Sequence, residues 1–399
     1  MDDIERRAFL KASAAGIACS VAGAYSPLAT GAAPAHGTVP HSASWQNRRL
    51  LDLLKIEHPI VQAPMGGHTR PDMPVAVSNA GGLGSFPCAL MTPAQIREEV
   101  ARMRTQTRKP INLNFFCHPV AVRDATLENA WLQRLEPYYA DLMVERPQLP
   151  SAALAPFGAE MCDLAVELRP EVVSFQFGLP APALIDRLKA AGCKILGTAT
   201  TVAEARWLAD HGADAVVAQG IEAGGHRGTF LPGAATSQLG TLALVPQVVD
   251  AVKVPVIAAG GIADGRGIAA ALTLGAAAVQ MGTAYLFCPE ASISPLYRAA
   301  LKSARDRTTV MTNVLTGLPA RVFENRLTRE LGPFASGVPA FPLPAAALAP
   351  LRSEAEFQGA ADFSTFYAGE SAPLGREMPA GELTLKLAAE ALKRLGSVS

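Results

Sequence analysis

Residues 256–283 read VIAAGGIADGRGIAAALTLGAAAVQMGT and contain one complete strand–helix–strand unit. The apolar run Val256–Ala259 ends at two glycines, the helical pattern Ala263–Leu274 follows, and a second apolar run covers Ala277–Met281. A strand that is apolar on both faces is typical of a parallel sheet covered by helices. This stretch therefore predicts two parallel strands joined by a helix.

The same alternation runs through the chain on the N-terminal side of this unit. Six more apolar runs predict strands at Pro59–Ala63, Leu83–Phe86, Pro110–Phe115, Val172–Gln176, Lys194–Thr198 and Ala215–Gln219. Helical patterns lie between them at Thr92–Arg104, Pro182–Ala191, Val202–His211 and Leu242–Val252. Eight strands alternating with helices predict an α/β fold, a closed (β/α)8 TIM barrel, with an open doubly wound sheet as the alternative.

This pattern divides the chain into three predicted parts. Residues 1–44 are predicted to be a leader, residues 45–288 the barrel, and residues 289–399 a helical segment that packs on the barrel and ends in the helix Glu382–Leu395. Residues 117–157 do not fit the strand–helix repeat, so they are predicted to be a helical insertion near the barrel mouth.

The leader has the pattern of an export signal. Arg6 and Arg7 precede Phe-Leu-Lys, the weakly apolar run Ala12–Tyr25 follows, and small residues close the segment at 33–35. This order resembles the twin-arginine (Tat) signal and predicts delivery to the periplasm by the Tat machinery. A basic disordered tail on a cytoplasmic protein is the alternative. No later segment has eighteen uninterrupted apolar residues, so a stable membrane span is not expected.

Composition excludes several classes of protein. The 399 residues carry 35 basic and 35 acidic side chains, and this balance argues against a protein that neutralises nucleic-acid phosphates. A hydrophobic fraction of 49% is too high for a disordered chain. The six cysteines form no C-x-x-C pair and have no zinc-ligand spacing, so no metal site is predicted.

Active sites of such barrels lie at the C-terminal ends of the strands. The first end carries Ala63, Pro64 and Met65, where a flat ring can approach the backbone, and the third and fourth ends carry the amides Asn114 and Gln176. The loops after the last two strands usually bind phosphate through free backbone amides. Candidates for that role are the small residues and the hydroxyl of these loops: Gly260, Gly261, Gly282 and Thr283. Asp264 is expected to cap the next helix.

His226 is the candidate catalytic residue. It follows Gly224 and Gly225 in the loop after the sixth strand. A neutral imidazole near pH 7 can remove a proton or, once charged, stabilise an anion. His68, His118 and His211 are expected to be structural or exposed.

Four motifs together are similar to the nitronate monooxygenase family, formerly called 2-nitropropane dioxygenase. They are PIVQAPM at 59–65, SNAGGLGS at 78–85, EAGGHRG at 222–228 and AAGGIADG at 258–265. The resemblance runs from about Leu50 to Leu395 and includes QLGTLALVPQ at 238–247 and YAGE at 367–370. Glu370 stands where this family pattern leads us to expect Gln.

The resemblance implies an FMN-dependent barrel enzyme without a metal. Ala63, Pro64 and Met65 would lie against the isoalloxazine, with Asn114 and Gln176 as polar partners and with Gly224 and Gly225 close to the ring. Gly260, Gly261, Gly282 and Thr283 would hold the phosphate. The implied reaction is oxidation of an alkyl nitronate by O2 to a carbonyl compound and nitrite, with His226 stabilising the nitronate or deprotonating a nitroalkane.

Three other functions remain open on the sequence alone. Related flavin barrels include NAD(P)H-dependent enoyl-acyl-carrier-protein reductases and quinone reductases, which NADH would reduce. A flavin carrier without turnover would be insensitive to loss of His226. A phosphate-binding barrel without flavin would be colourless.

Overall fold

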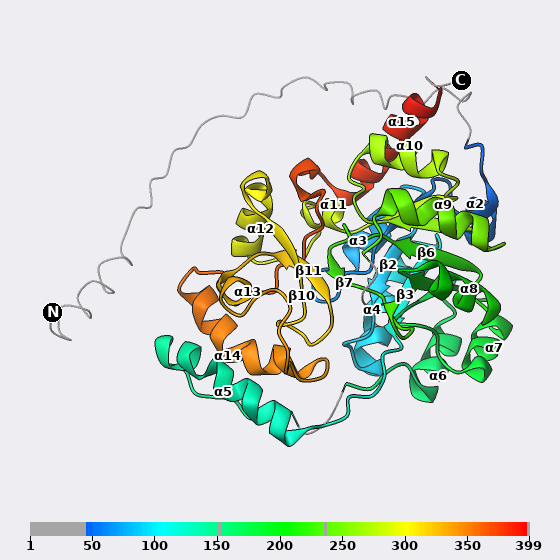
Figure 1. The fold of residues 1–399 in the computed structure, drawn as a ribbon. Coiled ribbons are helices and arrows are strands. Elements are labelled where there is room, and N and C mark those ends of the chain that lie inside the picture. Colours follow the sequence, from blue (N-terminus) through cyan, green and yellow to red (C-terminus); the bar gives the residue numbers. More distant parts are fainter. Residues whose placement is uncertain (1–44, 151–153, 235–237, 397–399) are drawn as a thin grey trace, which may run out of the picture. The chain divides into compact units, whose positions relative to one another are not determined.

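The computed structural model describes residues 45–150, 154–234 and 238–396. The predicted leader at 1–44 lies outside the described residues. The described part is a helix-covered barrel with further helices and a small sheet beside the barrel mouth (Figure 1).

Eight parallel strands form the barrel, as the sequence predicts. They are β1 (Ile60–Gln62), β2 (Gly84–Pro87), β3 (Ile111–Phe116), β4 (Val172–Gln176), β5 (Lys194–Ala199), β6 (Ala215–Gln219), β8 (Val256–Ala259) and β9 (Ala278–Met281). Their order is β1-β9-β8-β6-β5-β4-β3-β2. A parallel bridge between Val61 and Leu83 joins the two ends of this order. Hydrogen bonds from Gln62 N to Leu83 O (3.0 Å) and from Leu83 N to Ile60 O (2.9 Å) complete the closure. The open doubly wound sheet is therefore excluded.

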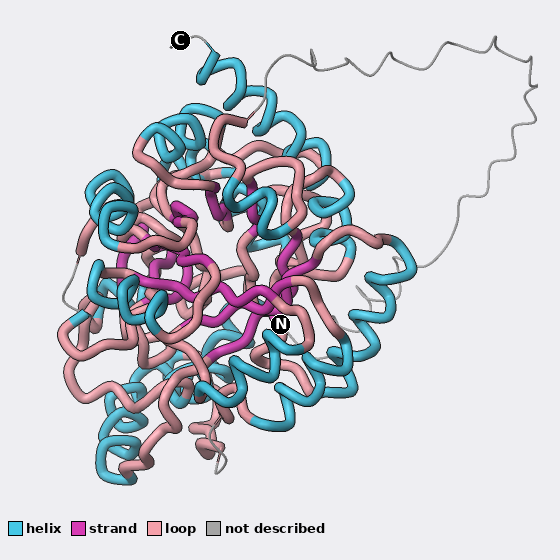
Figure 2. Tube along the Cα trace, turned by 90° about the vertical axis from the view of Figure 1, so that its right-hand side faces the viewer, coloured by secondary structure: helices cyan, strands magenta, loops and turns pink. Residues whose placement is uncertain are grey.

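Helices surround the strands, which lie at the centre of the tube view (Figure 2). Along the barrel they are α2 (Arg49–Leu54), α3 (Asp72–Asn79), α4 (Pro93–Gln106), α6 (Ala159–Leu168), α7 (Pro182–Ala190), α8 (Val202–Asp210), α9 (Thr241–Ala251) and α10 (Gly265–Thr273). Side-chain caps define several helix starts: Thr92 and Gln95 form a capping box on α4, and Asp264 accepts a hydrogen bond from Arg266 N (2.9 Å) on α10. Asp264 therefore has the capping role that the sequence predicts.

The interior of the barrel contains a polar layer below the mouth. Asn112 Nδ2 donates to Ser85 Oγ (3.0 Å) and to Ser174 Oγ (2.9 Å), so strands β2, β3 and β4 are joined by side chains as well as by the backbone. Buried polar groups are tolerated when they are paired in this way. Aliphatic residues of the strands and helices fill the rest of the core.

The insertion and the C-terminal segment share a second hydrophobic core. Helix α5 (Ala125–Asp141) packs on α14 (Leu343–Phe357) through Trp131, Leu135 and Tyr139 on one side and Ala347, Leu348 and Leu351 on the other. The Tyr139 hydroxyl donates to Ala347 O at 2.7 Å.

The C-terminal segment was predicted to be helical, but it contains strands as well as helices. Strand β10 (Thr309–Thr312) pairs with β11 (Ala320–Phe323), and β11 pairs with β7 (Gly225–His226), all antiparallel. The remaining elements are α11 (Thr283–Leu286), α12 (Pro295–Lys302), α13 (Arg326–Glu330), α15 (Ala380–Gly396) and the short 3-10 turns η2 (Ala304–Asp306) and η3 (Ala372–Leu374). Helix α15 returns to the barrel and packs against α10 and α3.

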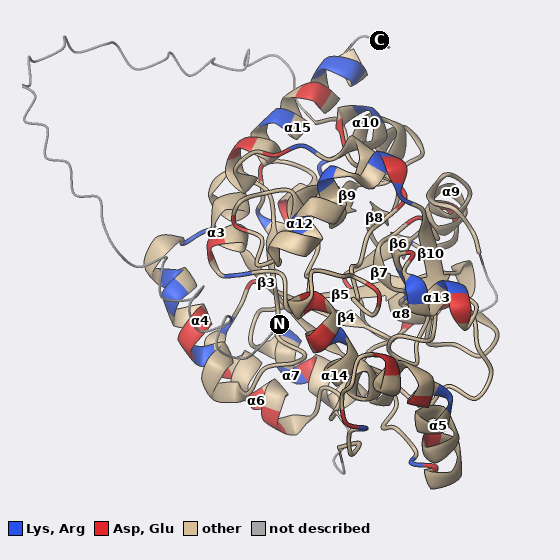
Figure 3. Ribbon diagram, turned by 90° about the vertical axis from the view of Figure 1, so that its left-hand side faces the viewer, with Lys and Arg blue, Asp and Glu red and all other residues tan. Residues whose placement is uncertain are grey.

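Acidic and basic side chains are interspersed on the outer helices (Figure 3). Many of them form surface ion pairs, such as Arg97 with Glu167 (2.7 Å) and Arg102 with Asp72 (3.1 Å). Within the described residues, no helix is long and apolar enough to cross a membrane.

Candidate active site

The C-terminal ends of the barrel strands keep accessible surface although the strands themselves are buried. Ala63, Pro64 and Met65 after β1 are half-buried, and so are Gln280, Gly282 and Thr283 at the end of β9. The hydrogen bond from Ala63 N to Met281 O (2.8 Å) holds these two ends side by side. The β1 end and the β9 end therefore form one continuous part of the mouth.

The loops after β8 and β9 carry hydrogen-bond donors that the protein does not use. Within the described residues, the backbone amides of Gly260, Gly261, Gly282 and Thr283 have no hydrogen-bond partner. Gly260 and Gly261 have φ values of +105° and +69°, a backbone conformation that favours glycine. Unpaired amides gathered at one rim form a site for an anionic group.

The backbone of residues 368–369 passes beside this rim and holds it in place. Gly369 N donates to Thr283 Oγ1 (3.0 Å), so the Thr283 hydroxyl keeps its own proton for another acceptor. A Cβ on Gly224 would lie 2.5 Å from Gly369 N and 2.7 Å from Ala368 C. Only glycine fits at position 224, because the backbone of residues 368–369 passes directly beside it.

The Glu222 carboxylate lies in the same loop and is held by Thr241. It accepts hydrogen bonds from Thr241 N (2.9 Å and 3.0 Å) and from the Thr241 hydroxyl (2.9 Å). These bonds fix the loop after β6 to the start of α9. Glu222 is therefore a structural residue.

His226 is held by its backbone and by its ring. Strand β7 pairs His226 with Ala320 of β11, and the His226 carbonyl accepts hydrogen bonds from Gln176 Nε2 (3.2 Å) and Gln219 Nε2 (3.0 Å). On the ring, Nε2 lies 2.9 Å from Thr316 Oγ1. Burial lowers the pKa of His226 from 6.5 to about 4, so the imidazole is neutral at physiological pH.

Aromatic rings surround the imidazole. The ring centres of Phe341, Tyr367 and Phe177 lie 5.4 Å, 5.4 Å and 6.0 Å from that of His226. Phe177 has φ +69°, an unusual conformation for a bulky residue, and such outliers cluster at functional sites. Phenylalanine carries no charge, and burial raises the pKa of Tyr367 well above its ordinary value. These three ring neighbours of His226 are therefore uncharged at physiological pH.

The predicted site residues have different roles in the structure. Gln176 contacts the His226 carbonyl through its amide nitrogen, and Asn114 Nδ2 is bound to Ser174 Oγ (3.0 Å) and Ser174 O (3.2 Å). In each of these two side chains the amide nitrogen is bound by the protein, whereas the amide oxygen has no protein partner within the described residues. His118 is buried and packs 5.2 Å from Phe341, and His211 stacks on Trp207 at 4.0 Å.

Several residues of the site were not predicted. Thr316 and Phe341 come from the C-terminal segment, and no local pattern in the sequence connects them with His226. Gln280 shares its position in the β9 register with Ala259 and Val61, and its side chain has no hydrogen bond within the described residues. A polar side chain near the end of a buried apolar strand, two residues before Gly282, was a usable signal. Tyr367 belongs to the YAGE motif, for which the sequence predicts no role at the site.

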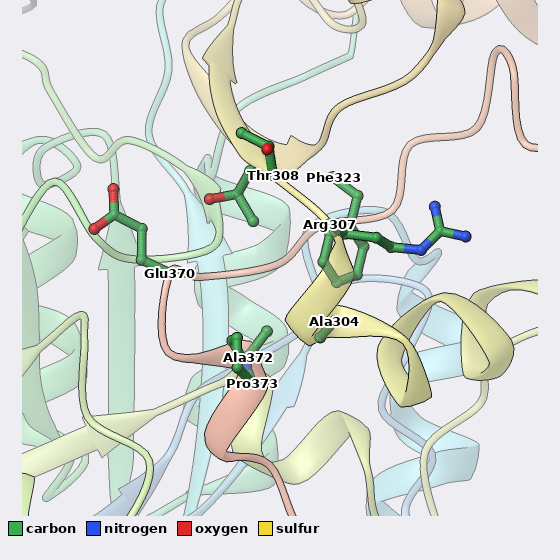
Figure 4. A pocket seen from close by; sticks show the side chains of 8 residues that line it. Ala304, Arg307, Thr308, Phe323, Glu370, Ala372 and Pro373 are labelled. Atoms are coloured by element: carbon green, nitrogen blue, oxygen red, sulfur yellow. The ribbon is translucent and has the colours of Figure 1, made fainter.

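A small open pocket of about 250 Å³ lies beside the C-terminal crossing (Figure 4). Arg307 and Glu370 are on opposite sides of it, and their charged groups point away from one another. Glu370 is paired with the buried Arg321 (3.0 Å), and Glu370 N donates to Glu222 O (3.0 Å). Glu370 therefore both lines this pocket and contacts the loop after β6.

Within the described residues, no group of three or more His, Cys, Asp or Glu side chains could hold a metal ion. The five described cysteines are free thiols, and four of them are fully buried.

Comparisons with known proteins show the family of this chain. The nitronate monooxygenase family matches residues 47–390. A nitronate monooxygenase of Pseudomonas aeruginosa is 43% identical over 86% of this chain and 98% of its own length. A probable nitronate monooxygenase of Staphylococcus saprophyticus is 38% identical over 84% of this chain and 95% of its own length.

Solved structures are also similar to this chain over most of its length. A nitroalkane oxidase from Streptomyces ansochromogenes superposes with a TM-score of 0.80 at 37% identity, covering 88% of this chain and all of that chain. FabK from Thermotoga maritima superposes with a TM-score of 0.64 at 30% identity, covering 88% of this chain and 97% of that chain.

Fold and site together define a (β/α)8-barrel enzyme with a rim of unpaired backbone amides and a neutral histidine at the strand ends. The chain belongs to the nitronate monooxygenase family, so it is an oxidoreductase of the monooxygenase type. Enzymes of this family are flavin-dependent in general.

Proposed function

We propose that this protein binds FMN at the barrel mouth and oxidises small alkyl nitronates with O2 to a carbonyl compound and nitrite. The observation that carries the proposal is the neutral, aromatic-enclosed His226 at the same strand ends as a rim of unpaired backbone amides. In a cofactor enzyme the protein supplies binding, orientation and electrostatics, and these two features would supply them here.

The residues of the rim fit the phosphate of FMN. Four unpaired amides and the Thr283 hydroxyl are donors, and a phosphate oxygen accepts from such donors. The nearby Glu222 carboxylate is held at the start of α9 by the backbone N–H and the hydroxyl of Thr241. Gly260, Gly261, Gly282 and Thr283 would therefore hold the phosphate.

The other predicted residues would hold the flavin ring. Ala63, Pro64 and Met65 offer a half-buried apolar surface, and Asn114 and Gln176 each keep an amide oxygen for a ring N–H. Gly225 has open space where a Cβ would be, so a planar ring can approach its backbone. When bound, the flavin takes electrons from the substrate and delivers them to O2.

His226 would take the Cα proton of a neutral nitroalkane. The carbon–hydrogen bond breaks, the imidazole gains the proton, and the electron pair moves onto the nitro group. The resulting imidazolium then lies beside the nitronate anion, and this attraction compensates for its poor solvation. The enclosing rings of Phe177, Phe341 and Tyr367 exclude water from this step.

Oxygen consumption tests this proposal directly. The purified protein with FMN is mixed in air with propionate 3-nitronate, with 3-nitropropionate or with NADH, and O2 and nitrite are followed together. The expected result is O2 uptake with nitrite formation from the nitronate and no oxidation of NADH. Oxidation of NADH without nitrite formation would identify an NAD(P)H-dependent flavin reductase instead. An inactive FMN complex would indicate a carrier.

We also propose export to the periplasm through the Tat machinery, on the strength of the Arg6-Arg7 pattern in the leader. The test is fractionation of cells that produce the full chain and the variant with both arginines replaced by Lys. The expected result is periplasmic enzyme for the natural chain only. If the two proteins were distributed equally between the cytoplasmic and periplasmic fractions, the leader would be a basic tail on a cytoplasmic enzyme.

A further inference from the structure

Thr316 contacts the ring of His226 from the segment that joins β10 to β11. Its hydroxyl oxygen lies 2.9 Å from His226 Nε2 and 3.2 Å from the carbonyl oxygen of Leu318. The side chain is buried, with 5% of its surface exposed, so water does not compete strongly for these contacts. Both contacts are within hydrogen-bond distance.

The hydroxyl has one proton, and this limits how both contacts can form. A carbonyl oxygen only accepts, so a hydrogen bond to Leu318 O uses the Thr316 proton. The Thr316 oxygen can then only accept from His226, which requires a proton on Nε2. If Thr316 instead donated to Nε2, the contact with Leu318 O would no longer be a hydrogen bond. Only the tautomer with Nε2–H satisfies both.

This tautomer leaves the lone pair on Nδ1. His226 Nδ1 has no hydrogen-bond partner within the described residues, and the rings packed around it belong to Phe177, Phe341 and Tyr367. The two phenylalanines cannot donate a hydrogen bond to it, and the Tyr367 hydroxyl, which could, makes no hydrogen bond within the described residues. Nδ1 is therefore the nitrogen that remains for a ligand.

We propose that Thr316 is a positioning residue that fixes the Nε2–H tautomer of His226, so that Nδ1 is the base for neutral nitroalkanes. This inference rests on the proposed function and assigns the reacting atom. The Cα–H bond of the substrate breaks, an Nδ1–H bond forms, and the electron pair of the broken bond goes to the nitro group. Substrates that arrive already as nitronates do not need this step.

The backbone contacts of His226 make the effect of Thr316 separable from folding. Gln176, Gln219 and strand β11 hold the His226 main chain, whereas Thr316 contacts only the ring. Removing the hydroxyl should therefore release the ring and its tautomer without moving the loop. Thr316→Val keeps the shape of the side chain and removes the hydroxyl, and Thr316→Ser keeps the hydroxyl.

The first measurement is nitrogen NMR of protein labelled with ¹⁵N-histidine, with His226→Gln used to assign the signal. At pH 7 we expect a protonated Nε2 and an unprotonated Nδ1 in the natural protein and in Thr316→Ser. Thr316→Val should show a mixture of tautomers. A protonated Nδ1 in the natural protein, or an unchanged tautomer in Thr316→Val, would overturn the proposal.

The second measurement compares two substrates. For Thr316→Val we expect kcat/KM for 3-nitropropionate to fall about 10- to 100-fold, part of the usual contribution of a positioned base. With propionate 3-nitronate it should change less than about 3-fold, and Thr316→Ser should restore the nitroalkane activity. Equal losses with both substrates contradict the proposal. If the protein has no nitronate activity, the proposed function fails, while the NMR result still decides the tautomer.

Discussion

Gln219 binds the main chain at His226 and again at Gly228 in the loop after β6. Its Nε2 donates to His226 O at 3.0 Å, and its Oε1 accepts from Gly228 N at 2.8 Å, two residues further on. The side chain is buried, so both bonds are made in a region of low polarity and are strong. Gln219 therefore fixes the path of the main chain on which the imidazole is mounted.

Replacing Gln219 by Met should loosen the histidine without removing it. Met has nearly the same volume but makes neither hydrogen bond, and Gln176 still holds the His226 carbonyl. We expect kcat/KM for nitroalkanes to fall about 10-fold and the free energy of unfolding to fall by about 1–3 kcal/mol. Gln247→Met on the exposed face of α9 is the matched control, and it should change neither value. Identical behaviour of the two variants in kinetics and denaturation would show that Gln219 has no such role.

His226→Gln should remove the base while leaving the cofactor site intact. We expect the rate with neutral nitroalkanes to fall about 10²- to 10⁴-fold, the usual contribution of a positioned acid or base. The FMN content should not change, because the rim amides do not contact this side chain. The control is His211→Gln, an imidazole stacked on Trp207 outside the site. Full nitroalkane activity in His226→Gln would exclude a role as base.

The lowered pKa of His226 should also affect stability. The folded protein binds a proton at His226 only below about pH 4, whereas the unfolded chain binds it below about 6.5. Between these values the unfolded state holds more protons, so stability falls as the pH decreases from 6.5 toward 4. The pKa values of His58 and His68 are lowered by burial too, and they contribute with the same sign.

The contribution of His226 is isolated by comparing two proteins. Urea denaturation of the natural protein and of His226→Gln is measured at pH 7.5 and at pH 4.5. The natural protein should lose more stability than the variant over this interval. Parallel losses would mean that the folded pKa of His226 is close to 6.5.

Gly224→Ala should weaken FMN binding. The new Cβ would lie 2.5 Å from Gly369 N, so the backbone of residues 368–369 must move, and with it the hydrogen bond from Gly369 N to Thr283 Oγ1. We expect FMN to be lost on gel filtration and its Kd to rise about 10-fold or more, about 1.4 kcal/mol for each factor of ten. Gly158→Ala is the control, because its nearest neighbour lies 3.9 Å away and its φ is negative. Retention of FMN by Gly224→Ala would place the phosphate elsewhere.

Much of the barrel could be predicted because its signals are local. Val172–Gln176, Ala215–Gln219 and Val256–Ala259 are strands with the predicted bounds, since each is a short apolar run that a parallel sheet buries on both faces. The position of the glycine loop at 260–261 was predicted too, because a loop at the barrel mouth begins where the apolar strand before it ends.

The surroundings of His226 could not be predicted because they are assembled from distant segments. Thr316 is 90 residues away in the sequence, and the β7–β11 pairing that brings it close involves only two residues of β7. Such a short strand has no detectable alternation of polar and apolar residues. Strands β10 and β11 lie in a segment that is rich in Ala and Leu, two good helix formers, so that segment was predicted to be helical.

The most direct test of the central claim is anaerobic mixing of the FMN-loaded protein with one reductant at a time, followed by its visible absorption spectrum. The expected result is loss of the oxidised flavin absorbance with propionate 3-nitronate and no change with NADH over the same period. Reduction by NADH alone, or a purified protein that neither contains FMN nor takes it up, would contradict the account.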